Sequence, residues 1–363
     1  MLHEIALTFI KGVGDITVKQ LVSYCGSAEE VFKSSKKALE KIPGIGSKTA
    51  ESIVSLGAFD RAEEELLFID KYKIKPLFYL NDDYPIRLKN CVDAPTILYF
   101  KGSANLNNQK VVSVVGTRNA TAYGRTICEK LIEGLKGHNL LVSSGLAYGI
   151  DIAAHKIALQ AGVETVGVLG HGLDRIYPAL HRPVAEKMLS QGGLLTEFPS
   201  QTNPERPNFP KRNRIIAGMA DATIVIEAAI RGGALITAEI ANSYNRDVFA
   251  VPGKLDDEFS EGCNFLIKTN RAHLLSKPED VEYIMGWFIN HKNIIKSQPK
   301  LFPDLSPEEQ KIVNIIKDHT TIGIDDLQAM LEMPQSKLAM LLLNLEMQSI
   351  IISLPGKVYR MDI

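Results

Sequence analysis

The middle of the chain alternates short apolar runs with amphipathic stretches. The runs are rich in β-branched residues and lie at 111–115, 140–143, 163–169, 222–226, 247–251 and 273–275. Helical periodicity separates them, with helices expected to begin near residues 122, 151, 179, 212 and 235. The runs are too apolar for strands that expose one face of their sheet to solvent. The pattern therefore predicts an α/β fold, a Rossmann-like, mostly parallel sheet with helices on both faces, over residues 76–288.

Residues 1–75 show helical periodicity interrupted by two related glycine turns, which predicts a small helical domain with helix-hairpin-helix-like corners. The turns are Gly12-Val13-Gly14 and Gly44-Ile45-Gly46. Such a turn leaves backbone amides free at the next helix, where they hold a phosphate, or it simply allows a tight corner. Asp15 directly after the first turn favours a corner there. For the second turn both interpretations stay open, with Gly44, Gly46 and Lys48 as candidate phosphate contacts.

The end of the chain has the pattern of a winged helix-turn-helix. A polar, proline-punctuated stretch at 289–305 predicts a linker. Ser306-Pro307 then supplies a helix cap and a first-turn proline. Helices are expected at 307–317, 324–331 and 335–347, and two strands at 350–353 and 357–360 around Pro355-Gly356. Residues 306–363 are therefore predicted to form a winged-helix domain.

Composition narrows the function classes without choosing one. The 363 residues carry 41 Lys and Arg against 42 Asp and Glu, a formal net charge of -1, which excludes a globally basic protein but not a local basic surface. Hydrophobic residues at 45% and charged residues at 23% indicate a folded chain. No run is long enough for a membrane span, no signal peptide is expected, and the 4 cysteines lack CxxC spacing. We therefore expect a cytoplasmic protein with no membrane association.

Two predicted strands end in glycine and hydroxyl residues, at the sheet edge where ligands bind in such folds. A bare amide at a strand-to-helix turn suits an anion. The candidate residues are Gly116, Thr117, Arg118, Ser143, Ser144, Gly145, Ala147 and Gly149. Neither loop has the G-x-G-x-x-G or GK[ST] fingerprint, so no cofactor is expected.

The strongest charge feature is a basic stretch, residues 206–214, which contains four basic side chains, no acidic ones and one aromatic. Its cations suit phosphates and its aromatic ring suits a base. The alternative for Phe209 is a hydrophobic staple ahead of a helix. The candidate DNA-binding residues here are Arg206, Phe209, Lys211, Arg212, Asn213 and Arg214.

The sequence shows no recognisable arrangement of catalytic residues. The histidines show no metal-ligand spacing, and the serine loop lacks the G-x-S-x-G elbow. We therefore predict no catalytic residue and no metal site.

Taken together, the motifs resemble the DNA-processing protein A (DprA or Smf) family. They are VGTR, SSGLAYGID, FPKRNRIIAGMAD, GGALITAEIA, DVFAVPG and GCNFLIKTNRAHLL, with YPIRLKNCVDAPTILYFKG at the entry to the central domain. The resemblance covers about residues 80–285. It implies a homodimer that binds single-stranded DNA, helps to load the RecA recombinase in natural transformation and has no catalytic activity. It places the DNA pocket at Gly116, Arg118, the 143–149 loop and the basic stretch.

Two positions depart from the family pattern. Leu146 stands where the serine loop often has arginine, and Lys337 is the only basic residue of the last predicted helix, 334–347. A protein-contact or packing role is therefore favoured over major-groove reading for that helix. Two other functions stay open. Residues 231–239 are similar to the GGxGTxxE box of enzymes that cleave nucleoside monophosphates, although Leu235 replaces a glycine. A scaffold with a merely solvated basic stretch is the other alternative.

Overall fold

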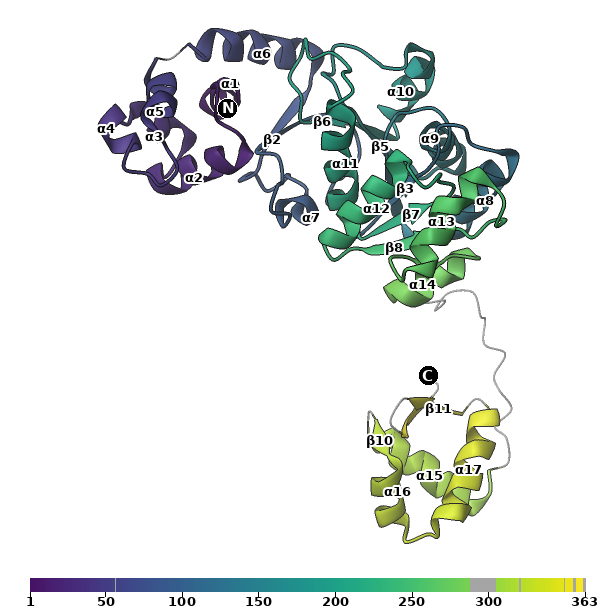
Figure 1. Cartoon of the computed structure of the whole chain (residues 1–363). Coiled ribbons are helices and arrows are strands. Elements are labelled where there is room, and N and C mark those ends of the chain that lie inside the picture. Colours follow the sequence, from purple (N-terminus) through teal and green to yellow (C-terminus); the bar gives the residue numbers. More distant parts are fainter. Residues whose placement is uncertain (56, 288–304, 320, 349, 355–356, 362–363) are drawn as a thin grey trace. The chain divides into compact units, whose positions relative to one another are not determined.

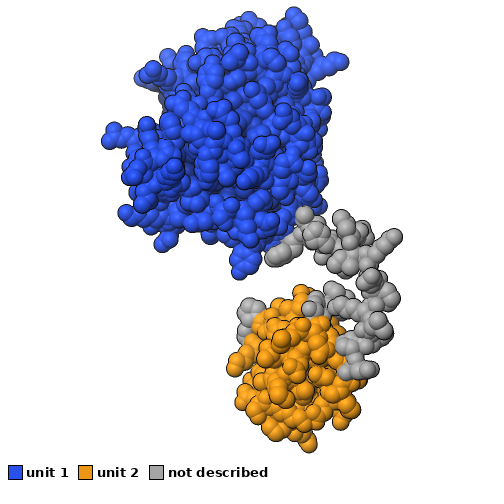
Figure 2. Space-filling view, turned by 90° about the vertical axis from the view of Figure 1, so that its right-hand side faces the viewer, with its two compact units in different colours: residues 1–289 blue, residues 290–363 orange. Residues whose placement is uncertain are grey.

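The structure is a computed structural model that describes residues 1–55, 57–287, 305–319, 321–348, 350–354 and 357–361. The chain divides into two compact units, residues 1–289 and 290–363, which are coloured separately in Figure 2. The predicted linker at 289–305 lies almost wholly outside the described residues, as does Pro355-Gly356. The predicted domain boundaries therefore stay predictions, and each unit is described by itself.

The first unit begins with a helical module of six helices (Figure 1), α1 (Leu2–Phe9), α2 (Asp15–Cys25), α3 (Ala28–Lys33), α4 (Lys36–Leu39), α5 (Ser47–Val54) and α6 (Phe59–Tyr72). The two glycine turns precede α2 and α5. Gly12 and Gly44 have φ of 84° and 78°, a conformation that glycine adopts without strain. Gly14 and Gly46 are the N-caps of the two helices. The predicted corners are therefore present.

The rest of this unit is built on a nine-stranded sheet, in the order β1-β2-β6-β5-β4-β3-β7-β8-β9. Its strands are β1 (Lys75–Phe78), β2 (Ile97–Gly102), β3 (Lys110–Val115), β4 (Leu140–Ser144), β5 (Glu164–Val168), β6 (Gly192–Thr196), β7 (Ala222–Val225), β8 (Asp247–Ala250) and β9 (His273–Leu274). From β6 to β9 all neighbours are parallel. Only β1 and β2 add antiparallel pairs at one edge. The predicted, mostly parallel sheet is confirmed.

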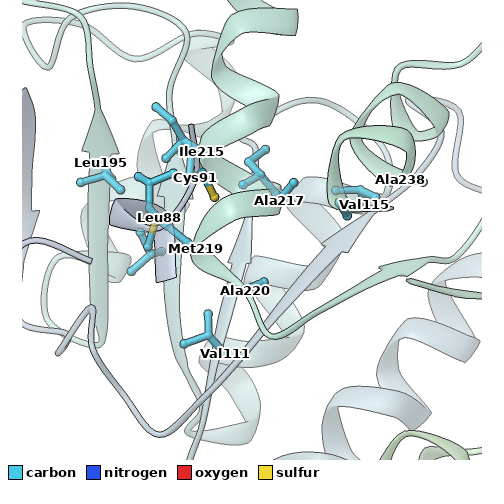
Figure 3. Packing of buried hydrophobic residues seen from close by; sticks show 14 of the residues in the cluster. Leu88, Cys91, Val111, Val115, Leu195, Ile215, Ala217, Met219, Ala220 and Ala238 are labelled. Atoms are coloured by element: carbon cyan, nitrogen blue, oxygen red, sulfur yellow. The ribbon is translucent and has the colours of Figure 1, made fainter. Parts of the chain in front are cut away.

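Helices cover both faces of this sheet. They are α7 (Ile86–Lys89), α8 (Ala122–Leu135), α9 (Ile150–Ala161), α10 (Arg182–Met188), α11 (Asn208–Met219), α12 (Gly233–Ser243), α13 (Glu258–Lys268) and α14 (Pro278–Met285), with short 3₁₀ turns at Lys136–His138 and Ala179–His181. One face packs against α11, α12 and α13, and Figure 3 shows Ile215 and Met219 of α11 in this layer. The other face packs against α8, α9 and α14. The expected three-layer arrangement is therefore confirmed.

Strand β2 is shared by two hydrophobic cores. Its side chains alternate between opposite faces, as in any strand. Leu98 and Phe100 belong to the core under α11 and α12. Ile97 and Tyr99 belong to the core of the helical module, together with buried side chains such as Ile5. The helical module is thus packed directly on the sheet rather than joined to it only by the chain.

The second unit has the winged-helix pattern. Its elements are α15 (Pro307–Asp318), β10 (Ile322–Gly323), α16 (Ile324–Leu331), α17 (Gln335–Met347), β11 (Ile351–Leu354) and β12 (Val358–Met361). The strands form a three-stranded sheet in the order β10-β12-β11. Ser306 and Glu309 form a capping box at the start of α15, as the sequence indicates. The fully buried Ile312, Leu327 and Leu338 join the three helices.

Candidate nucleic-acid interface

A cleft of about 860 Å³ opens beyond the carboxyl ends of the parallel strands. This is the edge where ligands bind in doubly wound sheets. Its walls come from the loops after β3, β4 and β5, the first turn of α11 and the first turn of α12. Eight of the predicted contact residues line it, namely Gly116, Thr117, Arg118, Ala147, Arg206, Phe209, Arg212 and Asn213. The structure thus brings together side chains that the sequence separates by almost a hundred positions.

An aromatic and cationic platform, formed by Arg118, Phe209 and Tyr177, lines the cleft. The exposed guanidinium of Arg118 lies 5.9 Å from the ring centroid of Phe209. The ring of Tyr177 is tilted against the same ring, with the centroids 6.2 Å apart. Because α11 begins at Asn208, Phe209 is inside the helix and does not precede it as a staple residue would. Its half-buried ring is therefore held where a ligand can reach it.

The floor of the cleft contains a buried cation and a buried carboxylate. Arg212 is 6% exposed, and its Nη1 donates to the carbonyl of Val168 at 2.6 Å. Burial lowers the pKa of Arg212, and the nearby Asp151 opposes that shift. Burial likewise raises the pKa of Asp151, against the effect of Arg212. Each charge thus compensates the other, and Arg212 supports the floor rather than reaching into solvent.

Two nitrogen atoms in the cleft wall are buried without a hydrogen-bond partner among the described residues. They are Nε of Arg212 and Nε2 of His171. Burial lowers the pKa of His171, so its imidazole is neutral near pH 7. Buried polar atoms are usually satisfied, so these two nitrogens are exceptions, and because both are closed off from solvent they belong to the packed wall of the cleft.

The serine loop shapes the cleft without exposing its hydroxyls. Ser143 and Ser144 are fully buried, and Ser144 Oγ donates to the carbonyl of Val114 at 2.6 Å. A Cβ on Gly145 would lie 2.0 Å from Nη1 of Arg212, so the missing side chain makes room for that guanidinium. Gly149 has φ of 79°, and a Cβ there would lie 2.1 Å from the carbonyl oxygen of Thr117. These residues support the cleft from behind.

The four basic side chains of the basic stretch have different surroundings. Arg206 and Lys211 are exposed, although only Arg206 lines the cleft. Arg212 forms the floor. Arg214 points to another cluster, where it pairs with Glu197, contacts Asp15 at 3.4 Å and donates to the carbonyl of Asp93. A DNA contact by Lys211 or Arg214 stays a prediction, and the contacts of Arg214 are within the protein.

The cluster around Arg214 makes the stability of the folded protein depend on pH. Burial raises the pKa of Glu197 from 4.5 to about 7, because desolvation and the neighbouring Asp15 outweigh the attraction of Arg214. The folded protein therefore binds a proton that the unfolded chain has released, and stability falls as the pH rises from about 4.5 to about 7. We expect Glu197→Gln to flatten this part of the curve of unfolding free energy, measured with urea at several pH values. The exposed Glu205→Gln is the control, and equal slopes for wild type and Glu197→Gln would contradict the assignment.

The helical module places its two glycine turns differently. Asp15, after the first turn, accepts from the backbone and the hydroxyl of Thr96 at 2.7 and 3.0 Å. The first turn thus docks on the following domain, as a corner would. Gly46 and Lys48 at the second turn are exposed and outside the cleft. Phosphate binding there stays a prediction.

The box that resembles a nucleotide-cleaving enzyme is only partly in the cleft. Gly233 and Thr237 line the wall. Glu239 is not among the lining residues, and its exposed carboxylate pairs with Arg271 at 3.3 Å. In the described part of the chain, no group of three or more His, Cys, Asp or Glu residues is arranged to hold a metal ion. None of the described helices is long and apolar enough to cross a membrane.

Comparison with known proteins identifies the family of this chain. Residues 75–285, more than half of the chain, match the model of the family described as DNA recombination-mediator protein A. The chain belongs to this family. The DprA resemblance of the central motifs is thereby confirmed. Residues 4–55 match a SAM-like helix-hairpin-helix tandem, and residues 296–357 match the DprA winged-helix domain.

Individual DprA relatives are similar in sequence to this chain over most of their length. Protein Smf of Synechocystis is 36% identical over 286 residues, which are 76% of this chain and 70% of the relative. DNA processing protein DprA of Streptococcus pneumoniae is 42% identical over 207 residues, 57% of this chain and 73% of the relative. The X-ray structure of DprA from Streptococcus pneumoniae superposes with a TM-score of 0.69 at 33% identity, covering 78% of this chain and 97% of that one.

A second solved DprA structure concerns DNA directly. The protein is DprA from Helicobacter pylori, whose structure gives insights into a unique single-stranded DNA binding mode. It superposes with a TM-score of 0.55 at 25% identity, covering 60% of this chain and 98% of that one.

Proposed function

We propose that this DprA-family chain binds single-stranded DNA in the cleft beyond the parallel strands and acts as a recombination mediator. The observation that carries the proposal is the platform of Arg118 over Phe209, beside Tyr177. A base stacked on such a ring contributes about 1–3 kcal/mol regardless of its identity. An exposed guanidinium next to the ring is placed to neutralise the phosphate that follows the base.

The remaining walls suit the nucleic-acid backbone. Arg206 adds a second exposed cation, and Lys211 lies outside the lining residues on the same helix as Phe209. The N-terminus of the eleven-residue helix α12 faces the cleft through Gly232 and Gly233. Its free amides and helix dipole favour an anion. The cleft thus offers cations and a helix N-terminus for phosphates beside the aromatic platform for a base.

The platform favours single strands over duplex DNA. A base must be unstacked from its neighbours to lie on Phe209, and this is inexpensive only when the base is unpaired. The near-zero net charge of the chain gives little general attraction to duplex DNA. We propose that the local platform, rather than overall charge, selects the strand.

The resemblance extends the proposal to partners. We infer that the chain works as a homodimer in the cytoplasm and that it helps to load the RecA recombinase. The family description as a recombination mediator supports this role. For the winged helix, Lys337 on α17 is engaged with Glu308, which supports a packing or protein-contact role rather than base reading.

The proposal is tested by measuring binding of the full chain to labelled oligothymidine and to a duplex of equal length by fluorescence anisotropy. We expect a clear preference for the single strand, and an affinity whose logarithm falls with the logarithm of salt by about 0.7 per phosphate neutralised. Equal affinity for the two DNAs would contradict the proposal and favour the scaffold alternative. Release of free adenine from AMP would favour the enzyme alternative.

A further inference from the structure

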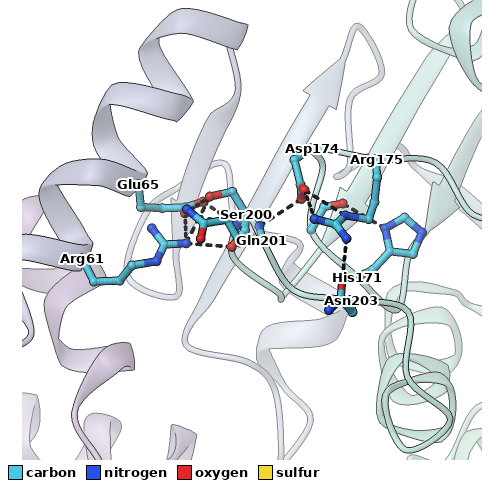
Figure 4. A network of polar contacts seen from close by, with 9 residues as sticks. Arg61, Glu65, His171, Asp174, Arg175, Ser200, Gln201 and Asn203 are labelled. Atoms are coloured by element: carbon cyan, nitrogen blue, oxygen red, sulfur yellow. Dashed lines mark hydrogen bonds and ion pairs between the residues drawn. The ribbon is translucent and has the colours of Figure 1, made fainter.

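The helical module holds one wall of the cleft through a buried carboxylate. Glu65 on α6 is 1% exposed. Its carboxylate accepts from the backbone amide of Ser200 at 2.9 Å and from the hydroxyl of Ser200 at 2.5 Å. Arg61, one helical turn earlier, donates to the same carboxylate at 2.8 Å and to the carbonyl of Ser200 at 2.7 Å (Figure 4). Every polar group of Ser200 is thus engaged by α6.

A second anchor holds the next residues of the same loop. The amide of Gln201 donates to Asp174 at 3.1 Å, and Arg175 bridges Asp174 and the side chain of Asn203 (Figure 4). Gln201 itself has φ of 69°, in the left-handed region. This conformation costs a residue other than glycine about 1–2 kcal/mol and persists only where the surroundings enforce it. The loop is therefore fixed between α6 and the loop after β5.

From these anchors the chain runs directly into the cleft. Pro204 and Arg206 line the cleft wall, and α11 begins only two residues after Arg206. Asn208, the first residue of α11, donates its side-chain amide to the carbonyl of Asn203 at 3.2 Å. Hydrogen bonds thus connect Ser200, through a short loop, to the helical turn that carries Phe209.

We propose that Glu65 is a positioning residue for strand binding: it holds the loop 199–207 so that Arg206 is in place before DNA arrives. The inference rests on the proposed binding of single-stranded DNA in this cleft. Glu65 is not among the lining residues, so it acts only through the loop. A loop fixed in its bound conformation loses less entropy when the ligand binds, and affinity rises accordingly. The helical module thereby contributes to DNA affinity without touching the strand.

The test compares two isosteric variants of the full chain, Glu65→Gln and Glu64→Gln. Both remove one negative charge from α6, but Glu64 is exposed and outside the network. We expect Glu65→Gln to weaken oligothymidine binding about tenfold with an unchanged salt slope, because no phosphate contact is lost. Amide hydrogen exchange in 199–207 of the DNA-free protein should become faster. Glu64→Gln should alter neither quantity.

A double-mutant cycle with Arg206→Ala separates positioning from general destabilisation. If Glu65 acts by presenting Arg206, the loss caused by Glu65→Gln should largely disappear in the Arg206→Ala background. Full additivity, or unchanged exchange in 199–207, would overturn the proposal. Ser200→Ala, which removes only the hydroxyl, should weaken binding about threefold and decides the question if Glu65→Gln does not fold. Absence of binding by the wild type would overturn the proposed function and this inference together, whereas normal wild-type binding with an unaffected Glu65→Gln overturns the inference alone.

Discussion

Replacing Arg118 with glutamate should reduce the affinity for oligothymidine about a hundredfold, a loss of roughly 3 kcal/mol. The wild-type guanidinium is exposed beside the Phe209 ring, where it is free to meet a phosphate. A carboxylate at the same place removes that attraction, repels the phosphate and gives up the cation–π contact. The salt slope should also become shallower by about 0.7, since one phosphate is no longer neutralised.

Lys130→Glu is the matched control for this variant. Lys130 is an exposed cation on α8 that does not line the cleft, so its reversal changes the net charge by the same amount. A general electrostatic effect would weaken binding equally in the two variants. We expect Lys130→Glu to retain nearly wild-type affinity, and equal losses would remove Arg118 from the site.

Gly149→Ala is expected to destabilise the fold by about 3 kcal/mol or more and to abolish DNA binding by the protein that remains folded. Two causes add: φ of 79° is unfavourable for alanine, and the new Cβ would lie 2.1 Å from the Thr117 carbonyl and 2.6 Å from the Arg118 carbonyl carbon. Relief of the clash must move the loop that carries Arg118. Urea unfolding and anisotropy on the same samples measure the two effects.

Gly162→Ala isolates the first cause, the left-handed backbone conformation. Gly162 ends α9 with φ of 74°, but a Cβ there has nothing within 4 Å. This variant should therefore lose only the free energy of placing alanine in a left-handed conformation, about 1 kcal/mol, and DNA binding should stay intact. If the two alanine variants were equally stable, the close approach of Gly149 to the 117–118 backbone would have no energetic weight.

Most of the central sheet could be predicted because the local sequence pattern of a strand is enough to identify it. Apolar runs that contain β-branched residues favour a buried strand, and β3, β4, β5, β7 and β8 were identified from them. The short exposed strand β9 was identified from an apolar run without a β-branched residue. Strand β6 was missed because it begins with Gly192-Gly193, which has the composition of a turn. Those glycines are required by close packing, since a Cβ on Gly193 would lie 2.5 Å from the Phe100 ring.

The loops of the cleft could be placed from the sequence, but the start of its helix α11 could not. Residues at strand ends must meet at one edge, so Thr117 and Ala147 could be placed from topology alone. The start of α11 was predicted near residue 212 but lies at Asn208, because Pro210 has a fixed φ and no amide, which the first helical turn tolerates. Without the correct start, the sequence gives no means to see that Arg214 turns away from the cleft.

Contacts between segments that are far apart in the chain could not be predicted, because the sequence around each residue does not indicate its partner. Glu65 and Ser200 are separated by 135 positions, and nothing near either residue indicates the other. Tyr177 lies in an irregular loop whose only visible feature is the following proline. Such residues become visible only after the chain is folded, because partners in tertiary structure are not encoded by periodicity.

Strand β2 has a consequence for how the protein unfolds. Its Ile97 and Tyr99 are 3% and 2% exposed, and most of the buried side chains in their cluster belong to the helical module. A chain shortened to begin at residue 75 would present this apolar face to water and invite association. The helical module and the sheet should therefore melt in a single cooperative transition, although the family match divides them near residue 75.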